Sequence, residues 1–226
     1  MVTNTRRTQR GESSLSRDRI IDTAIALLDE SGEAGLTFRA LAERLSTGAG
    51  AIYWHVADKD DLVGAACDAI VAATLAEARA GAPARAAIRA IGLGLFDALD
   101  LHPWIGAALM RSPGKMPMVR IMEGIGRQVQ ALGVPPDALW TGASTLLHYV
   151  LGVAGQNAAN AQFARTHALV REDFLAEVAG QWSALDAHAF PFTRAAAARL
   201  AQHDDRADFL AGIDLIVAGI AAARPV

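Results

Sequence analysis

The side chains best suited to hold a phosphate backbone lie between residues 37 and 59. Thr37 and Arg39 carry a hydroxyl and a guanidinium, and Tyr53, His55 and Lys59 carry further hydrogen-bond donors. Donors of this kind fix a protein's register on DNA, whereas contacts to base edges select the sequence. The pattern therefore points to nucleic-acid recognition rather than to catalysis.

The residues placed to meet base edges are small. Gly48, Ala49, Gly50 and Ala51 offer few side-chain hydrogen bonds, but they let the backbone approach closely and let methyl groups touch thymine. The alternative is that the aromatic residues at 53–55 only close a small helical core. The candidate DNA contacts are Thr37, Arg39, Thr47, Gly48, Ala49, Gly50, Tyr53, Trp54, His55 and Lys59.

A cluster of arginines, Arg6, Arg7 and Arg10, precedes the first acidic residue of the chain. We expect residues 1–15 to form a flexible basic arm that enters a minor groove, so that DNA shape contributes to sequence choice. An inert tail is the alternative. The net charge of the chain is −3, so a DNA-binding surface must be a narrow face together with this arm.

Short helices must position these donors. Apolar spacing predicts a helix over 16–31, and Thr37 is placed to cap a second one. A turn at Ser46 to Gly48 leads to a short third helix over 49–55, and Asp58 begins a fourth that runs to about residue 80. In a helix-turn-helix, the helix after the turn lies in the major groove and the helix before it crosses the phosphates.

Beyond Pro83 the sequence becomes alanine-rich and weakly charged. Prolines and glycines predict helices near 84–100, 104–110, 116–132, 137–164, 168–188 and 193–223, the last broken near His203. No alternating strand pattern occurs, so the expected fold is all-α. We expect a three-helix helix-turn-helix domain over 16–62 and a helical ligand-binding and dimerisation domain over 63–226, linked by the helix at 58–80.

The segment from Ala138 to Ala164 contains no Asp, Glu, Lys or Arg. A membrane span needs about 20 mostly apolar residues, but polar side chains interrupt this run, so a helix buried in a core or an interface is favoured and no membrane partner is expected. A single cysteine, Cys67, and the absence of an apolar leader favour a cytoplasmic protein.

Enzymatic and metal sites receive little support. Ser144 and His148 are one helical turn apart, but no acidic residue or oxyanion loop completes a catalytic group. The six histidines form no pair with zinc-ligand spacing. We therefore expect no catalytic residue, no metal and no cofactor.

Two segments carry a family resemblance. The run from Leu36 to Leu62, with LTFRALA at its start and IYWHVADKDDL at its end, resembles the DNA-binding domain of the tetracycline-repressor (TetR) family. FLAGIDLIVAGI at 209–220 is similar to the last helix of the tetracycline repressor's own subgroup. The resemblance implies an all-α homodimer that holds a palindromic operator through its front helices. Ser46 stands where the family usually has a glycine.

The resemblance also places an effector pocket among the helices behind the front domain. Leu75 and Ile91 stand where the tetracycline repressor presents a histidine and an asparagine, which argues against a magnesium–tetracycline ligand. We expect an apolar, partly aromatic ligand, although methionines and tryptophans at helical spacing also pack in ordinary cores. The candidate ligand contacts are Leu75, Ile91, Leu95, Trp104, Leu109, Met110, Ile121, Met122, Ile125, Trp140 and Gln156.

We expect the protein to be a homodimeric, ligand-responsive transcriptional repressor that binds double-stranded DNA. A small-molecule effector would favour a spacing of the two helix-turn-helix domains that does not fit the operator. The helix at 58–80 would link each of these domains to its ligand-binding domain. The alternative is a helical small-molecule-binding or interaction protein that does not recognise a specific DNA sequence. The glycine- and alanine-rich segment at 48–51 is compatible with this alternative, because it offers few side-chain hydrogen bonds to bases.

Overall fold

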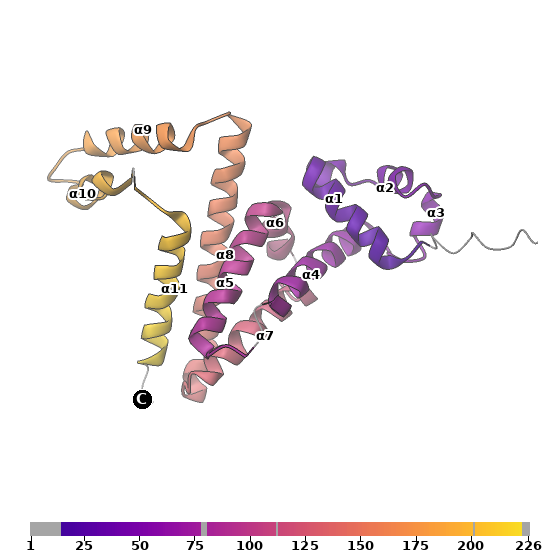
Figure 1. Ribbon diagram of the computed structural model, residues 1–226, viewed down its shortest axis with the longest axis horizontal. Helices are drawn as coiled ribbons and strands as arrows, with labels where there is room; N and C mark the ends of the chain where they lie inside the picture. Colours follow the sequence, from indigo (N-terminus) through magenta and orange to yellow (C-terminus); the bar gives the residue numbers. More distant parts are fainter. Residues whose placement is uncertain (1–14, 78–80, 112, 201, 223–226) are drawn as a thin grey trace, which may run out of the picture. The chain divides into compact units, whose positions relative to one another are not determined.

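Only α-helices, turns and irregular segments make up the part of the chain that the structure describes, as the sequence predicts (Figure 1). This computed structural model describes residues 15–77, 81–111, 113–200 and 202–222. The helices are α1 (Arg17–Gly35), α2 (Phe38–Arg44), α3 (Ala49–Ile52), α4 (Lys59–Glu77), α5 (Ala84–Leu101), α6 (Trp104–Arg111), α7 (Met116–Ala131), α8 (Pro136–Thr166), α9 (Arg171–Ser183), α10 (Pro191–Leu200) and α11 (Asp205–Ala221).

The chain divides into two compact units, residues 1–69 and 70–226. The boundary falls within α4, between Ala69 and Ile70. The boundary expected from the sequence, after residue 62, lies in the first turn of the same helix.

Side-chain caps begin the helices of the first unit. Oγ1 of Thr37 accepts a hydrogen bond from the backbone N–H of Ala40 (3.0 Å), and Oδ1 of Asp58 accepts one from the N–H of Asp61 (2.8 Å). These bonds satisfy donors that have no partner in the first turn of a helix. The sequence-based cap at Thr37 and the helix start at Asp58 are thus confirmed.

The turn that follows α2 has the geometry of a Schellman motif. The N–H of Thr47 donates to the carbonyl of Ala42 (2.9 Å), and the N–H of Ser46 donates to the carbonyl of Glu43 (3.1 Å). Ser46 has a φ of 52°, in the left-handed region. Glycine is the usual residue there because it has no Cβ to clash. This conformation gives a physical reason for the glycine that the family resemblance leads one to expect.

Three helices differ in their ends from the predicted ones. Helix α1 continues to Gly35 through a kink at Gly32, whose φ is 61°. Helix α3 ends at Ile52, because residues 53–55 form a turn. Helix α9 covers only Arg171–Ser183. Pattern reading fixes such ends to within a few residues, since terminal turns are held by local hydrogen bonds.

Helix α8 is the centre of the second unit and packs against α5, α7 and α11. Leu95, Ile105, Leu146, Phe209 and Ile213 lie in this core and are at most 1% exposed. Among the described residues, no helix is both long and apolar enough to cross a membrane.

Two glycines let α11 approach its neighbours closely. A Cβ placed on Gly92 would lie 2.4 Å from Cδ1 of Ile213, and one placed on Gly212 would lie 1.8 Å from the hydroxyl oxygen of Tyr149. That hydroxyl donates to the carbonyl of Phe209 (3.1 Å), and the rings of Tyr149 and Phe209 stack with centroids 5.7 Å apart. Gly212 therefore makes room for the contact between α8 and α11.

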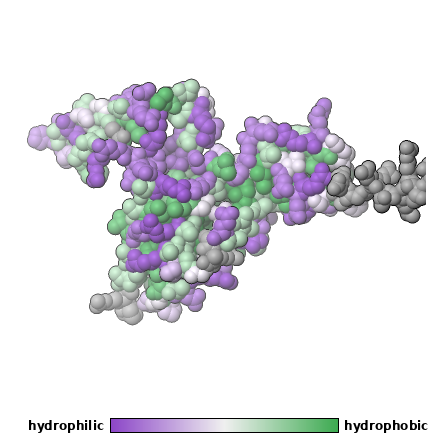
Figure 2. All heavy atoms as spheres, in the orientation of Figure 1, coloured by the Kyte–Doolittle hydropathy of each residue, from purple (hydrophilic) through white to green (hydrophobic). Residues whose placement is uncertain are grey.

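Helices α9 and α10 pack mainly against each other and form a hairpin between α8 and α11 (Figure 1). No residue of α9 is buried, and Phe174, Phe190 and Phe192 are exposed. Polar and apolar atoms are mixed on the face of this hairpin drawn in Figure 2. Arg171, at its start, donates to the carbonyl of His203 (3.1 Å) and pairs with Asp205 (2.5 Å), which ties the hairpin to the start of α11.

Candidate nucleic-acid interface and ligand cavity

The N-terminal end of α2 presents two donors to solvent. Thr37 and Arg39 are both exposed. Oγ1 of Thr37 acts as an acceptor in the cap, so its hydroxyl hydrogen is left to donate elsewhere. Arg39 forms no hydrogen bond or ion pair with other described residues. Backbone N–H groups and side-chain donors at a helix start form a site suited to phosphate.

An aromatic pair orients the tyrosine after α3. The rings of Phe38 and Tyr53 stack with centroids 4.4 Å apart and an interplanar angle of 13°. Tyr53 remains 56% exposed and Trp54 is 89% exposed, so neither closes a core. His55 is half-buried. Sequence analysis did not single out Phe38; the signal was an aromatic residue directly after the capping threonine.

The segment with small side chains is open to solvent. Gly48, Ala49 and Gly50 are exposed, and Thr47 is half-buried. A Cβ placed on Gly48 or Gly50 would have no neighbouring atom within 4 Å. The backbone at the start of α3 can therefore come close to a flat partner, while Ile52 and Val56 anchor the segment in the core of the unit.

Two of the cations in this unit already have protein partners. Arg44 forms a two-bond ion pair with Glu30, with N–O distances of 2.8 and 2.7 Å, and this pairing lowers the pKa of Glu30. The ammonium of Lys59 donates to the backbone carbonyl of Glu33. These bonds attach α2 and the start of α4 to α1. The arginines Arg6, Arg7 and Arg10 lie outside the described residues.

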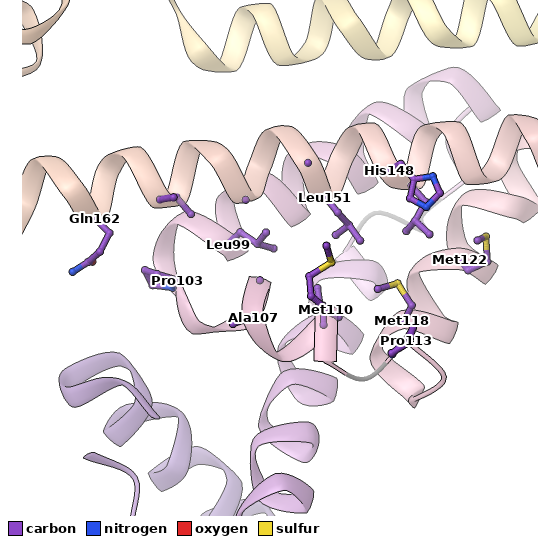
Figure 3. A pocket seen from close by; sticks show the side chains of 17 residues that line it. Leu99, Pro103, Ala107, Met110, Pro113, Met118, Met122, His148, Leu151 and Gln162 are labelled. Atoms are coloured by element: carbon purple, nitrogen blue, oxygen red, sulfur yellow. The ribbon is translucent and has the colours of Figure 1, made fainter. Parts of the chain in front are cut away.

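The second unit contains a cavity of about 810 Å³, bounded by α6, α7, α8 and the C-terminal end of α5 (Figure 3). A volume of this size suits a drug-sized ligand. Its walls are formed by Leu99, Pro103, Gly106, Ala107, Leu109, Met110, Pro113, Met118, Met122, Leu147, His148, Leu151, Gly152, Gly155, Ala158, Ala159 and Gln162. None of the described lining residues is Asp, Glu, Lys or Arg, and His148 is the one titratable side chain among them.

The structure distributes the predicted ligand contacts over several environments. Leu109, Met110 and Met122 line the cavity. Trp140 is 70% exposed, and Gln156 lines a smaller cavity of about 240 Å³ beside Tyr149 and His203. The remaining candidates are side chains in the packed core, at most 7% exposed: Leu75, Ile91, Leu95, Trp104, Ile121 and Ile125.

Sequence reasoning missed several lining residues, most of which are small or polar. Gly152, Gly155 and Gln162 occupy the cavity side of α8, and Met118 lies on α7. The available signal was the run of glycines and alanines three or four residues apart along an uncharged helix.

The described residues give little support for a metal site or for a reactive serine or cysteine. No group of three or more His, Cys, Asp and Glu side chains is placed to hold a metal within them. The hydroxyl of Ser144 donates to the carbonyl of Thr141 (3.2 Å). Burial raises the pKa of the Cys67 thiol to about 12, which keeps it protonated and unreactive.

Both units match families of known proteins. Residues 20–66 match the model for bacterial regulatory proteins of the tetR family, and residues 82–224 match the tetracyclin repressor-like C-terminal domain. An HTH-type transcriptional regulator from Saccharopolyspora erythraea is 31% identical over 140 residues, which cover 61% of this chain and 59% of that protein. The class C tetracycline repressor of Escherichia coli is 42% identical over 59 residues, 26% of this chain and 27% of the repressor.

A solved structure extends the likeness to both units. The transcriptional regulator SCO7222, a TetR from Streptomyces coelicolor, is 50% identical, with a TM-score of 0.85 and coverage of 92% of this chain and 99% of that chain. TetR-family regulators bind DNA operators and small-molecule effectors and are not enzymes. This chain, with a helix-turn-helix in its first unit and an uncharged cavity in its second, belongs to the TetR family of DNA-binding transcriptional regulators.

Proposed function

We propose that this protein is a homodimeric repressor that leaves a palindromic operator when a small, largely apolar ligand binds in the second unit. The observation that carries the proposal is the uncharged cavity of about 810 Å³ in a chain whose first unit presents a helix-turn-helix. A regulator without an effector would have no need for a cavity of this size, since interiors are normally packed without large voids.

The exposed faces of α8 and α11 support the dimer. Trp140 on α8 and Leu215 on α11 are 70% and 75% exposed. An apolar groove between these helices is lined by residues that include Thr141, Ile216 and Gly219. A helix with an apolar core face and an uncharged outer face needs a second partner, and a two-fold axis is the commonest way for identical chains to provide one.

On DNA, we assign the donors of α2 to phosphates and the start of α3 to base edges. Thr37 and Arg39 hold the backbone, and the exposed backbone at Gly48 and Gly50 allows close approach to the major groove. Because side-chain readout there is limited to Thr47, Tyr53 and His55, sequence choice also depends on DNA shape.

Release follows from a shift between two conformations. The ligand must bind the conformation that does not fit the operator more tightly than the one that does, since only differential affinity moves the equilibrium. Helix α4 is the covalent route for this coupling, because the boundary between the units falls within it.

The decisive experiment selects bound fragments from a genomic DNA library and then screens compounds that release the selected site. A shared palindrome, released by a ligand of the cavity, is the expected result. Salt-sensitive binding without a shared sequence would instead favour the helical ligand-binding or interaction protein.

Two matched variants sharpen this test. Arg39→Ala should lower the slope of log K against log salt by about 0.9 for each phosphate that the arginine neutralises in the wild-type complex. Arg44→Ala should change the slope less, because Arg44 is already paired with Glu30. An equal effect of the two variants would contradict the assignment of Arg39 to phosphate.

The dimer has its own test. A Cβ on Gly219 meets no atom within 4 Å, so Gly219→Arg should fold normally and yet keep a second copy away. We expect this variant to sediment as a monomer and to lose operator affinity. Ala131→Arg, at an exposed site at the end of α7, serves as the control. A wild-type monomer at micromolar concentration would refute the proposed assembly.

A further inference from the structure

The cavity of the second unit is long, and most of its wall on α8 is made of small residues. Its lining residues on α8 run from Leu147 to Gln162. At 1.5 Å per residue, the fourteen-residue separation of His148 and Gln162 corresponds to about 21 Å along the helix. Between them the wall consists of Leu151 near the His148 end, followed by Gly152, Gly155, Ala158 and Ala159, and none of these last four extends beyond a Cβ.

The two glycines in this wall are not needed for packing within the unit. A Cβ placed on Gly152 or on Gly155 would meet no atom within 4 Å, whereas one placed on Gly212 would collide with Tyr149. Within the unit, Gly152 and Gly155 therefore do not serve the close approach of another helix. What they leave open is the space of the cavity.

Methionines form much of the opposite wall. Met110 comes from α6, and Met118 and Met122 come from α7 (Figure 3). Unbranched thioether side chains adapt to the shape of a ligand, and their sulfurs make favourable contacts with aromatic rings. A wall made mostly of small residues, facing adaptable thioethers, is a suitable slot for a flat ring system.

Polar groups in the lining lie at two separated places. His148 and Gln162 project from α8 toward the cavity side, several turns apart (Figure 3). Apart from His148, the described lining residues offer no side chain that could pair with a charged ligand, because none of them is Lys, Arg, Asp or Glu. A neutral ligand with hydrogen-bonding atoms toward its two ends fits this lining best.

We infer that the effector of this protein is a neutral, elongated, fused-ring aromatic molecule that carries an oxygen acceptor near each end of its long axis. This inference rests on the proposed function, because it names the ligand class of the same cavity. The rings lie against Gly152 and Gly155, the methionine sulfurs contact the rings from the opposite side, and His148 and Gln162 bind the terminal oxygens.

The test uses two probes of the same shape, 2,6-dimethoxyanthraquinone and 2,6-dimethylanthraquinone, with binding to the full-length protein measured by equilibrium dialysis without DNA. Palmitate and the planar cation ethidium represent the excluded classes. The dimethoxy compound should bind more tightly than the other three. Preferential binding of palmitate or ethidium would overturn the inference.

Variants locate the binding site. Gly155→Leu should weaken binding of both quinones at least about a hundredfold while leaving the helical circular dichroism and the melting temperature near wild type, because its side chain enters open space. Gly180→Leu, at an equally open position on α9, is the matched control and should bind normally. His148→Ala and Gln162→Ala should each weaken the dimethoxy probe about threefold to tenfold and leave the dimethyl probe unchanged.

The outcomes separate this inference from the proposed function. Quinone binding that Gly155→Leu does not weaken would overturn the assigned slot. Quinone binding that leaves operator affinity unchanged would refute ligand-controlled release but support the ligand class. Release of DNA by a charged or purely aliphatic compound that competes for the cavity would support the repressor and overturn the inferred ligand.

Discussion

Replacing Ser46 by glycine should stabilise the helix-turn-helix. Ser46 holds a φ of 52° at the end of α2, in a conformation that costs a residue with a Cβ roughly 1–2 kcal/mol. Glycine would avoid this cost, but its greater conformational freedom in the unfolded chain lowers the free energy of unfolding by about 0.4–1 kcal/mol. Ser46 is exposed and its side chain forms no hydrogen bond with other described residues, so removing the side chain loses little else. The net gain is about 0.7 kcal/mol.

Amide hydrogen exchange measures this effect at the turn itself. A single melting temperature is a poor readout for a chain with two units, whereas exchange reports local opening. The N–H of Thr47, which closes the turn onto Ala42, should exchange about threefold more slowly in Ser46→Gly. Ser46→Ala should behave like wild type, because alanine keeps the Cβ. Ser46→Val should exchange faster, since a branched side chain fits this region worst.

A second turn supplies the control. Ala168 has a φ of 51° after α8, and the N–H of Leu169 donates to the carbonyl of Ala164 (2.9 Å) in the same bond pattern. Ala168→Gly should slow exchange at Leu169 and leave the turn after α2 unchanged. Equal exchange of Thr47 in the glycine and valine variants of Ser46 would show that the left-handed conformation is not what limits the stability of this turn.

Three further predictions concern packing and ionisation. Gly212→Ala should destabilise the second unit by about 1–3 kcal/mol in thermal denaturation, because its Cβ would lie 1.8 Å from the hydroxyl of Tyr149; Gly180→Ala, where space is open, should not. Cys67, whose pKa is raised to about 12, should resist iodoacetamide at pH 8 in the folded chain and react in guanidinium; equal rates would contradict its burial. Arg44 lowers the pKa of Glu30, so the stability that Glu30 contributes should be present at neutral pH and disappear as the pH falls through the lowered value; a difference between wild type and Glu30→Gln that persists in strong acid would refute this.

The front unit could be predicted from sequence because its signals are local. Thr37 and Asp58 form caps whose hydrogen bonds reach only three residues along the chain, to Ala40 and Asp61. The left-handed conformation of Ser46 was harder to predict, because a positive φ is common for glycine and uncommon for serine. The partners of Arg44 and Lys59 could not be predicted, because they lie fourteen and twenty-six residues away in the sequence.

The cavity was harder to predict for a physical reason. Apolar side chains at helical spacing, such as Ile91 and Ile121, fill cores and line pockets equally well, and here they are buried in the core. A cavity is an absence of side-chain volume, which a sequence expresses through glycines such as Gly152 and Gly155. Whether such a glycine faces a helix or an open space is decided only by the packing of α6, α7 and α8.

The buried state of Cys67 also has a practical consequence. It is the only cysteine among the 226 residues, and its thiol is protected by burial. The wild-type chain therefore serves directly as a background for site-specific spin or fluorescent labels, with no native residue to remove first. A cysteine introduced at an open position such as Gly219 would carry the only reactive thiol in the protein. A pulsed-resonance distance between two such labels would then report directly on the pairing of two chains.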